Sequence, residues 1–242
     1  KSQQEKLLLT ERHEAWENVA RKLAHEIKNP LTPIQLTIDR LKTKYEKSID
    51  GNEKENFKNY LKTIIKQIKQ IESLVNEFSD FARMPKPILQ NCNIIEIIKS
   101  NISLLKEFGK NISINLNCKN SELFLKCDAD QISRVFLNLI KNSIESIQEK
   151  ALKTGNFVKK IVIEIKRINN YIAINIFDNG IGFSKKITKE IIKPYYTTKE
   201  KGSGLGLSIV NKIINDHNGT INFKSIQNGA KVEIILNKKN VS

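Results

Sequence analysis

The chain has 242 residues, of which 39% are hydrophobic and 28% charged; this supports a folded core in one large or two modest domains and excludes wholesale disorder. Lys and Arg outnumber Asp and Glu by 41 to 26, for a formal net charge of +15, but only six of the basic residues are Arg. Because base-reading surfaces favour Arg, whose planar head forms two parallel hydrogen bonds, we interpret the charge as a basic solvated surface. We therefore expect no direct nucleic-acid partner, although the charge favours encounters with an acidic protein or a polyphosphate.

The first part of the chain, up to about residue 83, is predicted to form two long helices. Apolar residues recur there at spacings of three and four, which predicts a heptad-like seam on each helix. The seam positions are Leu23, Ile27, Leu31, Ile34, Ile38 and Leu41, then Leu61, Ile64, Ile68, Ile71, Val75, Phe78 and Ala82. A polar turn at 48–55 separates the helices, and residues 1–19 lead in as a helix in which Trp16 packs. Because two antiparallel helices have too little core to stand alone, we expect a second copy to complete a four-helix bundle.

A domain boundary is predicted at Met84-Pro85-Lys86-Pro87, because two prolines end a helix and stiffen a short linker. It divides the chain into residues 1–85 and 86–242. The second part mixes both kinds of element. Helices are expected at 94–108, 129–150 and 205–217, and strands at 112–118, 123–127, 161–166, 172–176, 220–225 and 231–237, with a hairpin turn at Asn169-Asn170. We expect a mixed sheet covered by helices on one face, so the fold class is α+β.

His25 lies two residues from Leu23 and two from Ile27, so a turn of about 100° per residue points it away from the seam and toward solvent. The neighbouring Glu26 can hydrogen-bond one ring nitrogen and raise the basicity of the other, as a nucleophile requires. A single surface histidine beside a glutamate is most often incidental, so this pair carries little weight alone.

Asn138 and Asn142 lie four residues apart on the predicted 129–150 helix, with Lys141 between them, so both amides share one face. Amide oxygens placed in this way can hold Mg²⁺ together with phosphate oxygens and water. Two surface asparagines on an ordinary helix are an equally good interpretation of this pair taken alone.

Asp178 follows the 172–176 strand and precedes Gly180 and Gly182. A carboxylate at a strand end, beside backbone that glycine leaves uncrowded, can accept a hydrogen bond from an exocyclic amine such as that of adenine. An ordinary Asp-Asn-Gly turn is the alternative.

Three alternating glycines, Gly202, Gly204 and Gly206, stand just before the 205–217 helix, and Thr197 and Lys199 precede them. Glycines at a helix start present free N–H groups and the positive end of the helix dipole to an anion. The segment lacks a preceding strand and a Lys-Ser pair, which excludes the dinucleotide and P-loop fingerprints. Alone, it can equally be a flexible linker.

The order of these motifs resembles that of the histidine kinases of two-component signalling. The matching segments are the H box at 25–31 (HEIKNPL), the N box at 138–142 (NLIKN), and the two glycine boxes at 178–182 (DNGIG) and 202–207 (GSGLGL). Residues 23–41 (LAHEIKNPLTPIQLTIDRL) are especially similar to sensor kinases of the nitrogen-regulation type. The resemblance covers nearly the whole chain and includes every box in order.

The resemblance implies a helical hairpin that pairs into a dimeric four-helix bundle, followed by an α/β sandwich of the histidine kinase and chaperone ATPase type. Residues 1–85 would carry dimerisation and the phosphoacceptor, and residues 86–242 would bind ATP with Mg²⁺. His25 would accept the γ-phosphoryl group, and Glu26 would act as base or orienting acid. Asn29 would orient water for dephosphorylating the partner.

The resemblance also assigns the nucleotide site. Asn142 would ligate Mg²⁺, Asn138 would support the phosphates, and Asp178 would recognise adenine. The other expected site residues are Lys141, Gly180 and Gly182, a lid over the phosphates formed by Thr197, Lys199, Gly202, Gly204, Leu205, Gly206 and Leu207, and Thr220 acting through water. One segment departs from the family, because Ile192 and Lys193 stand where a Phe and an acidic residue are usual. We expect this departure to affect lid packing and domain docking.

The resemblance implies a homodimer that passes its phosphoryl group to an aspartate in the receiver domain of a response regulator. The odd number of cysteines favours a reducing compartment, and we expect a cytoplasmic location. The chain begins with Lys1, so we expect a fragment, attached to a membrane only through a missing N-terminal segment.

Three alternatives stay open. A net phosphatase would depend on Asn29 more than on ATP turnover, and dephosphorylation by the Asn29→Ala variant separates the two. A chaperone or topoisomerase ATPase would need a carboxylate at position 138, where this chain has Asn. A basic nucleic-acid-binding or coiled-coil protein would leave the ordered boxes unexplained.

Overall fold

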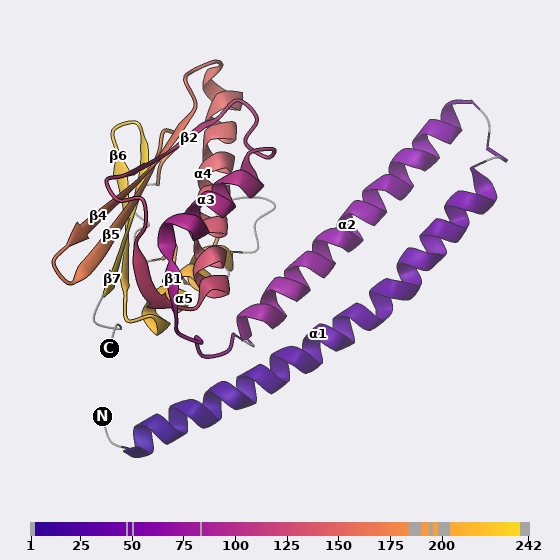
Figure 1. Ribbon diagram of the computed structural model, residues 1–242. Coiled ribbons are helices and arrows are strands. Elements are labelled where there is room, and N and C mark those ends of the chain that lie inside the picture. The colour runs from indigo at the N-terminus through magenta and orange to yellow at the C-terminus, as the bar shows by residue number, and fades with distance from the viewer. Residues whose placement is uncertain are drawn as a thin grey trace. The chain divides into compact units, whose positions relative to one another are not determined.

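The computed structural model describes residues 3–46, 48–49, 51–82, 84–183, 190–193, 196–197 and 204–237. The chain divides into two compact units, residues 1–85 and 86–242, which we call the helical unit and the α/β unit. Figure 1 shows a pair of long helices in the first and a sheet with its helices in the second.

The helical unit is an antiparallel hairpin of α1 (Gln3–Tyr45) and α2 (Asn52–Ala82). Its core repeats every seven residues, because that spacing returns a side chain to the same face of a helix. The core consists of Leu31, Ile38, Leu61 and Ile68, flanked by Phe57 and Ile65. Near the turn, Lys58 Nζ and Glu46 Oε1 form an ion pair of 3.3 Å. The two predicted helices are confirmed, and α1 continues through Pro30 and Pro33 as one helix.

Only part of the expected seam is buried within one chain. Four seam residues of α1 are exposed by 38% to 44%: Leu23, Ile27, Ile34 and Leu41. On α2, Ile64 and Ile71 are similarly exposed, by 44% and 40%. The physical reason is that a two-helix hairpin covers each helix on one side only, so the apolar residues beside the buried ones face outward.

The α/β unit is built on a five-stranded sheet with the strand order β2-β4-β5-β7-β6. These strands span Ser113–Cys118 (β2), Lys160–Ile168 (β4), Tyr171–Asp178 (β5), Thr220–Ile226 (β6) and Gly229–Asn237 (β7). The β2–β4 pair is parallel and the others are antiparallel. A separate antiparallel pair joins β1 (Gln90–Asn93) to β3 (Phe124–Cys127). The short β1 was not among the expected strands, since QNCN has no apolar alternation.

Three helices cover one face of the five-stranded sheet: α3 (Ile94–Leu105), α4 (Ala129–Thr154) and α5 (Gly206–Asp216) (Figure 1). Alternation along β5 places Ile172, Ile174 and Ile176 under the helices, where each is at most 1% exposed. The mixed sheet with helices on one face is therefore confirmed. The central helix, α4, extends beyond its expected end to Thr154, where Gly155 adopts a φ of 80° and ends it.

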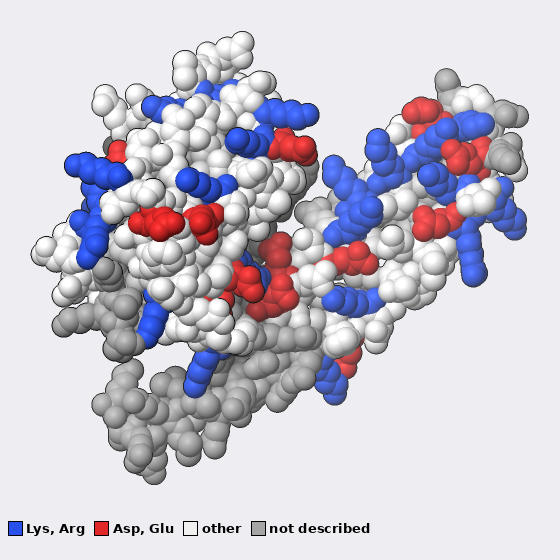
Figure 2. Space-filling model, viewed as in Figure 1, with Lys and Arg blue, Asp and Glu red and all other residues white. Residues whose placement is uncertain are grey.

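Basic side chains gather on the turn end of the helical hairpin, as Figure 2 shows. Exposed lysines repeat every four residues on α2, at Lys58, Lys62 and Lys66.

Within the residues that the structure describes, no helix combines the length and the apolar character needed to cross a membrane.

Candidate active site

His25 lies on α1 and is exposed, as are Glu26 and Asn29. The buried residues of this part of the helix, Ala24 and Leu31, are 2% and 7% exposed and lie about 100° to 120° around the helix from His25. The sequence-based expectation that His25 points away from the seam is confirmed. Asn29 follows one helical turn after His25 and shares its face. This part of α1 therefore presents an imidazole, a carboxylate and an amide to solvent.

Asn138 and Asn142 lie on α4, both half-buried, whereas Lys141 between them is exposed. The Nδ2 of Asn138 donates a hydrogen bond of 2.9 Å to the carbonyl oxygen of Arg134. The Oδ1 of the same amide is directed toward the start of α5, because a Cβ added to Gly206 would lie 3.1 Å from it. Any side chain at position 206 would press on this amide, so glycine lets α5 begin against α4.

Asp178 ends β5 and is only 7% exposed. Its Oδ1 accepts the backbone N–H of Gly180 at 3.0 Å, and its Oδ2 accepts the hydroxyl of Ser143 on α4 at 3.1 Å. Burial raises the pKa of this carboxyl above its ordinary value of 3.8, although hydrogen bonds from Gly180, Ser143 and Ala230 act in the opposite direction. The geometry fixes both carboxylate oxygens in a largely dry place, as recognition of a base requires.

The two glycines after Asp178 are required by the protein's own packing as well as by any ligand. A Cβ on Gly180 would lie 2.2 Å from the hydroxyl oxygen of Ser146 and 2.7 Å from the backbone of that residue. Gly182 has a φ of 75°, and a Cβ there would lie 2.7 Å from the carbonyl oxygen of Gly229. Sequence reasoning expected these glycines to admit the base. The structure adds that they let the loop lie directly on α4 and on the start of β7.

Lys150 and Asn179 hold the segment beside this loop. The ammonium of Lys150 donates to the carbonyl oxygen of Asn179 at 2.9 Å and lies 5.0 Å from the centre of the Phe157 ring. The side chain of Asn179 bridges two backbone groups, because its Nδ2 donates to the carbonyl of Val158 at 2.6 Å and its Oδ1 accepts the N–H of Lys160 at 2.9 Å. The loop after Asp178 is thus tied both to α4 and to the start of β4.

The second glycine box is described only from Gly204, which has a φ of 70°. Leu205 precedes α5 and is 1% exposed, Gly206 and Leu207 are half-buried, and no side-chain hydrogen bond caps this helix at Leu205. Leucine has no side-chain oxygen with which to cap the helix, and the N-terminal end of a helix is the end that suits an anion. Lys199 and Gly202 lie outside the described residues. The remaining expected residues, Thr197 and Thr220, are both exposed, with Thr220 beginning β6.

In the segment that departs from the family pattern, Ile191 is 7% exposed and Ile192 is half-buried. Lys193 is exposed and lies 3.4 Å from Glu190 in an ion pair. Pro194 and Tyr195 lie outside the described residues.

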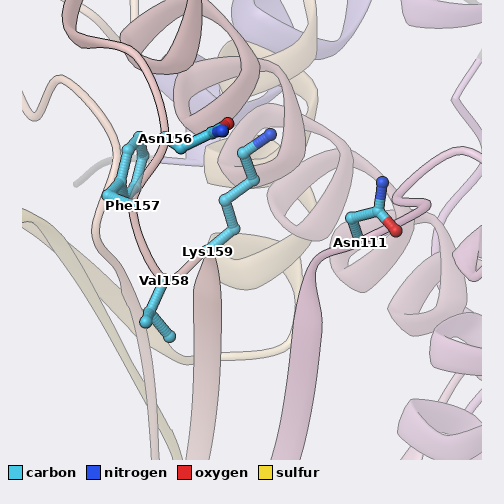
Figure 3. A pocket seen from close by; sticks show the side chains of 5 residues that line it. All are labelled: Asn111, Asn156, Phe157, Val158 and Lys159. Atoms are coloured by element: carbon cyan, nitrogen blue, oxygen red, sulfur yellow. The ribbon is translucent and has the colours of Figure 1, made fainter.

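A hollow of about 390 Å³ also opens on the α/β unit, before β4. Figure 3 shows Asn156 and Phe157 on one side of it and Asn111 on the other, with the Lys159 side chain between them. Val158 completes the lining, so none of the predicted site residues borders this hollow. Sequence reasoning did not point to it, and it takes no part in the site that Asn138, Asp178 and Gly206 outline.

Two family models match the chain. Residues 15–87 match the His Kinase A (phospho-acceptor) domain, and residues 127–240 match the Histidine kinase-, DNA gyrase B-, and HSP90-like ATPase family. The chain is 37% identical over 230 residues to a putative sensor histidine kinase, NtrY-like, of Rickettsia bellii. It is 36% identical over 233 residues to the nitrogen regulation protein NtrY of Azorhizobium caulinodans. The chain belongs to the two-component sensor histidine kinases.

This sensor histidine kinase core is only part of the length of its relatives. The two alignments take in 95% and 96% of this chain, but 36% and 30% of the relatives, so the chain spans about a third of their length. Among solved structures, the histidine kinase ThkA in complex with the response regulator protein TrrA matches with a TM-score of 0.65 and 27% identity, covering 95% of this chain and 64% of that one. The catalytic domain of ThkA alone matches with a TM-score of 0.55 and 27% identity, covering 62% of this chain and 95% of that one.

The side chains of the candidate site fit a metal ion that takes most of its ligands from a bound nucleotide. Among the described residues, no group of three His, Cys, Asp or Glu side chains could hold a metal ion. The site instead offers the amides of Asn138 and Asn142 on one face of α4. Amide oxygens and phosphate oxygens together form the oxygen-only shell that Mg²⁺ prefers.

Sequence reasoning missed three residues of α4 that hold the loop after Asp178: Ser143, Ser146 and Lys150. The available signal was polar character that continues for two turns beyond Asn142 on a helix otherwise patterned for burial. Periodicity places these residues at the edge of the buried face, but it does not say which loop they meet.

Proposed function

We propose that this chain is the catalytic core of a protein histidine kinase that transfers the γ-phosphoryl group of ATP to His25. The observation that carries the proposal is what meets α4 at two points along its length. The buried carboxylate of Asp178 meets the helix at Ser143, and the start of α5 meets it at Asn138 through Gly206. An acceptor for the adenine amine and an anion-binding helix terminus therefore stand at two ends of one site, as a nucleotide requires.

In the proposed reaction, a ring nitrogen of His25 attacks the γ-phosphorus with its lone pair. The bond from that phosphorus to the β,γ-bridging oxygen breaks, and ADP leaves with the electron pair. The phosphorylated imidazolium then loses its other ring proton, for which Glu26 is the adjacent acceptor. The exposure of both side chains suits this chemistry. The protein contributes positioning and charge neutralisation, since phosphoryl transfer needs little covalent work from it.

Asn142 is the proposed Mg²⁺ ligand, and Asn138 supports the phosphates beside it. A Mg²⁺ bound there would neutralise charge on the phosphate oxygens. An amide at position 138 cannot act as a base toward water, which suits a kinase that must spare ATP from hydrolysis. Lys141 is exposed next to these amides and adds a positive charge.

The proposed product is passed to an aspartate of a response regulator. A kinase of related fold, ThkA, has been solved in complex with such a regulator. We place this transfer in the cytoplasm, where ATP is available. Dephosphorylation of the same partner is a second proposed activity, which rests on Asn29 lying exposed one turn after His25.

We also propose that the helical unit pairs with a second copy. The exposed residues Leu23, Ile27, Ile34 and Leu41 fall within about 40° of one another around α1, at about 100° per residue. On α2, Ile64 and Ile71 are displaced around the helix from the buried Leu61 and Ile68. The displacement has the same rotational direction as that of the exposed residues of α1 from the buried ones. Antiparallel helices with the same offset present these residues on one side of the hairpin. A second hairpin would cover that side and complete a four-helix bundle.

The proposed acceptor is tested by intact mass after incubation with Mg·ATP. The chain has three histidines, and His217 is 2% exposed with both ring nitrogens within hydrogen-bond distance of backbone groups. We expect the wild type to gain one phosphoryl group that is lost in acid, and His25→Gln to gain none. The matched control is His13→Gln, on the same helix, which should be phosphorylated like the wild type. Phosphorylation of His25→Gln, or none of the wild type, would refute the proposed reaction.

A further inference from the structure

The loop that carries Asp178 is fixed by two hydroxyls one turn apart on α4. Ser143 donates to Asp178 Oδ2 at 3.1 Å, and Ser146 accepts the backbone N–H of Ile181 at 3.1 Å. Gly180, between these two points, lies against the backbone of Ser146. The turn from 178 to 181 is therefore seated on one rigid helix at both ends, so the carboxylate cannot shift without breaking one of these contacts.

The protein groups that bond to the Asp178 carboxylate all donate. They are the Ser143 hydroxyl, the N–H of Gly180 and the N–H of Ala230. Ser143 is itself 4% exposed, so water does not easily replace its hydroxyl. A carboxylate held in this way has acceptor capacity left for a ligand and nothing to donate. A 6-amino purine offers a donor to it, whereas a 6-oxo purine offers a second acceptor, which the carboxylate repels.

We infer that Ser143 is a specificity-determining residue, which positions Asp178 as an acceptor and thereby makes the site prefer adenine over hypoxanthine nucleotides. The inference rests on the proposed nucleotide site. Without the Ser143 hydroxyl, Oδ2 loses its partner and the carboxylate is free to rotate out of the direction that the adenine amine needs. The loss of binding affinity therefore affects adenine nucleotides, whose amine donates to Asp178, and leaves hypoxanthine nucleotides, which lack that amine, unaffected.

The experiment measures binding of ADP and of IDP, each with Mg²⁺, by isothermal titration calorimetry on the full chain. We expect Ser143→Ala to bind ADP about tenfold more weakly, as the loss of a hydrogen bond to a charged group implies, and IDP with less than about a threefold change. The preference for ADP over IDP therefore falls several-fold. Ser143→Thr keeps the hydroxyl, and we expect it to retain the preference.

The matched control is Ser133→Ala. Ser133 lies on the same helix, and its hydroxyl bonds to Asn101 at 2.9 Å and 3.3 Å, away from the Asp178 loop. We expect its preference for ADP to equal that of the wild type. Equal weakening of both nucleotides by Ser143→Ala would mean that Ser143 only supports the fold and would overturn the inference. An unchanged preference would do the same. A wild type that binds neither nucleotide would instead refute the proposed site itself.

Discussion

At the scale of single residues, Asp178 is a carboxyl group held in a buried place. Its side chain is 7% exposed, and burial raises its pKa, although three hydrogen bonds favour the charged form. A buried carboxylate lowers the stability of the folded state, and an apolar side chain would pack more favourably at this position. A carboxyl group kept in such a place is typical of a functional site, in agreement with the proposed role of Asp178 in nucleotide binding.

The burial of Asp178 predicts a pH dependence of stability. Because the pKa of Asp178 is higher in the folded protein than its ordinary 3.8, the folded state binds more protons between those two values. The free energy of unfolding therefore rises as pH falls through the raised pKa of Asp178. This gain is complete below pH 3.8. Urea unfolding followed by circular dichroism should show the wild type gaining stability over Asp178→Asn as pH is lowered from 7 to 4. A free energy of unfolding of the wild type, minus that of Asp178→Asn, that stays constant or falls as pH is lowered would contradict the raised pKa.

At the scale of elements, α4 is the helix on which the site is assembled, and Asp128 fixes where it begins. The Oδ1 of Asp128 caps the helix by accepting the N–H of Gln131 at 3.1 Å. Its Oδ2 accepts the N–H of Ile88 at 2.9 Å, and its backbone N–H donates to Nε2 of the buried His217 at 3.0 Å. One residue thus joins the start of α4 to the segment after the prolines and to the end of α5.

Substituting this residue should loosen α4. We expect Asp128→Ala to lower the free energy of unfolding by about 1 to 2 kcal/mol, because a helix cap and a second hydrogen bond are lost together. The control is Asp130→Ala, exposed in the same first turn, which loses only a favourable interaction with the helix dipole, worth less than about 1 kcal/mol. Hydrogen exchange of α4 peptides, measured by mass spectrometry, reports the difference. Equal effects of the two variants would refute the anchoring role.

At the scale of the whole molecule, the two units differ in how complete their cores are. The α/β unit buries isoleucines fully under its helices, whereas the hairpin leaves four of the six seam residues of α1 and two of the seven of α2 exposed. Exposed apolar residues aligned along both helices are a recurrent mark of an interaction surface. The helical unit is the part of the chain whose stability should depend on protein concentration.

Sedimentation equilibrium tests this dependence. Ile34, which is 44% exposed, lies in the exposed stripe, and Ile34→Glu would place two carboxylates in the proposed dimer interface. We expect dimerisation to weaken by at least about 100-fold, because buried unpaired charges cost several kcal/mol. The control is Leu36→Glu, on the His25 face of α1 and 55% exposed, which should leave the dimer intact. A monomeric wild type, or equal effects of both variants, would contradict the proposed pairing.

The sequence by itself indicated every element of the fold except β1, together with the boundary region near the prolines, the mixed sheet and the family. Periods of 3.6 and 2, together with motifs in a fixed order, are local signals that a single chain displays in full. Which residues of each heptad stripe are buried was decided by tertiary structure, because Leu31 and Ile34 are equally apolar in the sequence and differ only in what lies opposite them. The roles of Ser143 and Ser146 were also decided there. A hydroxyl gains a role from the group it meets, and the loop that meets these two is 35 residues away along the chain.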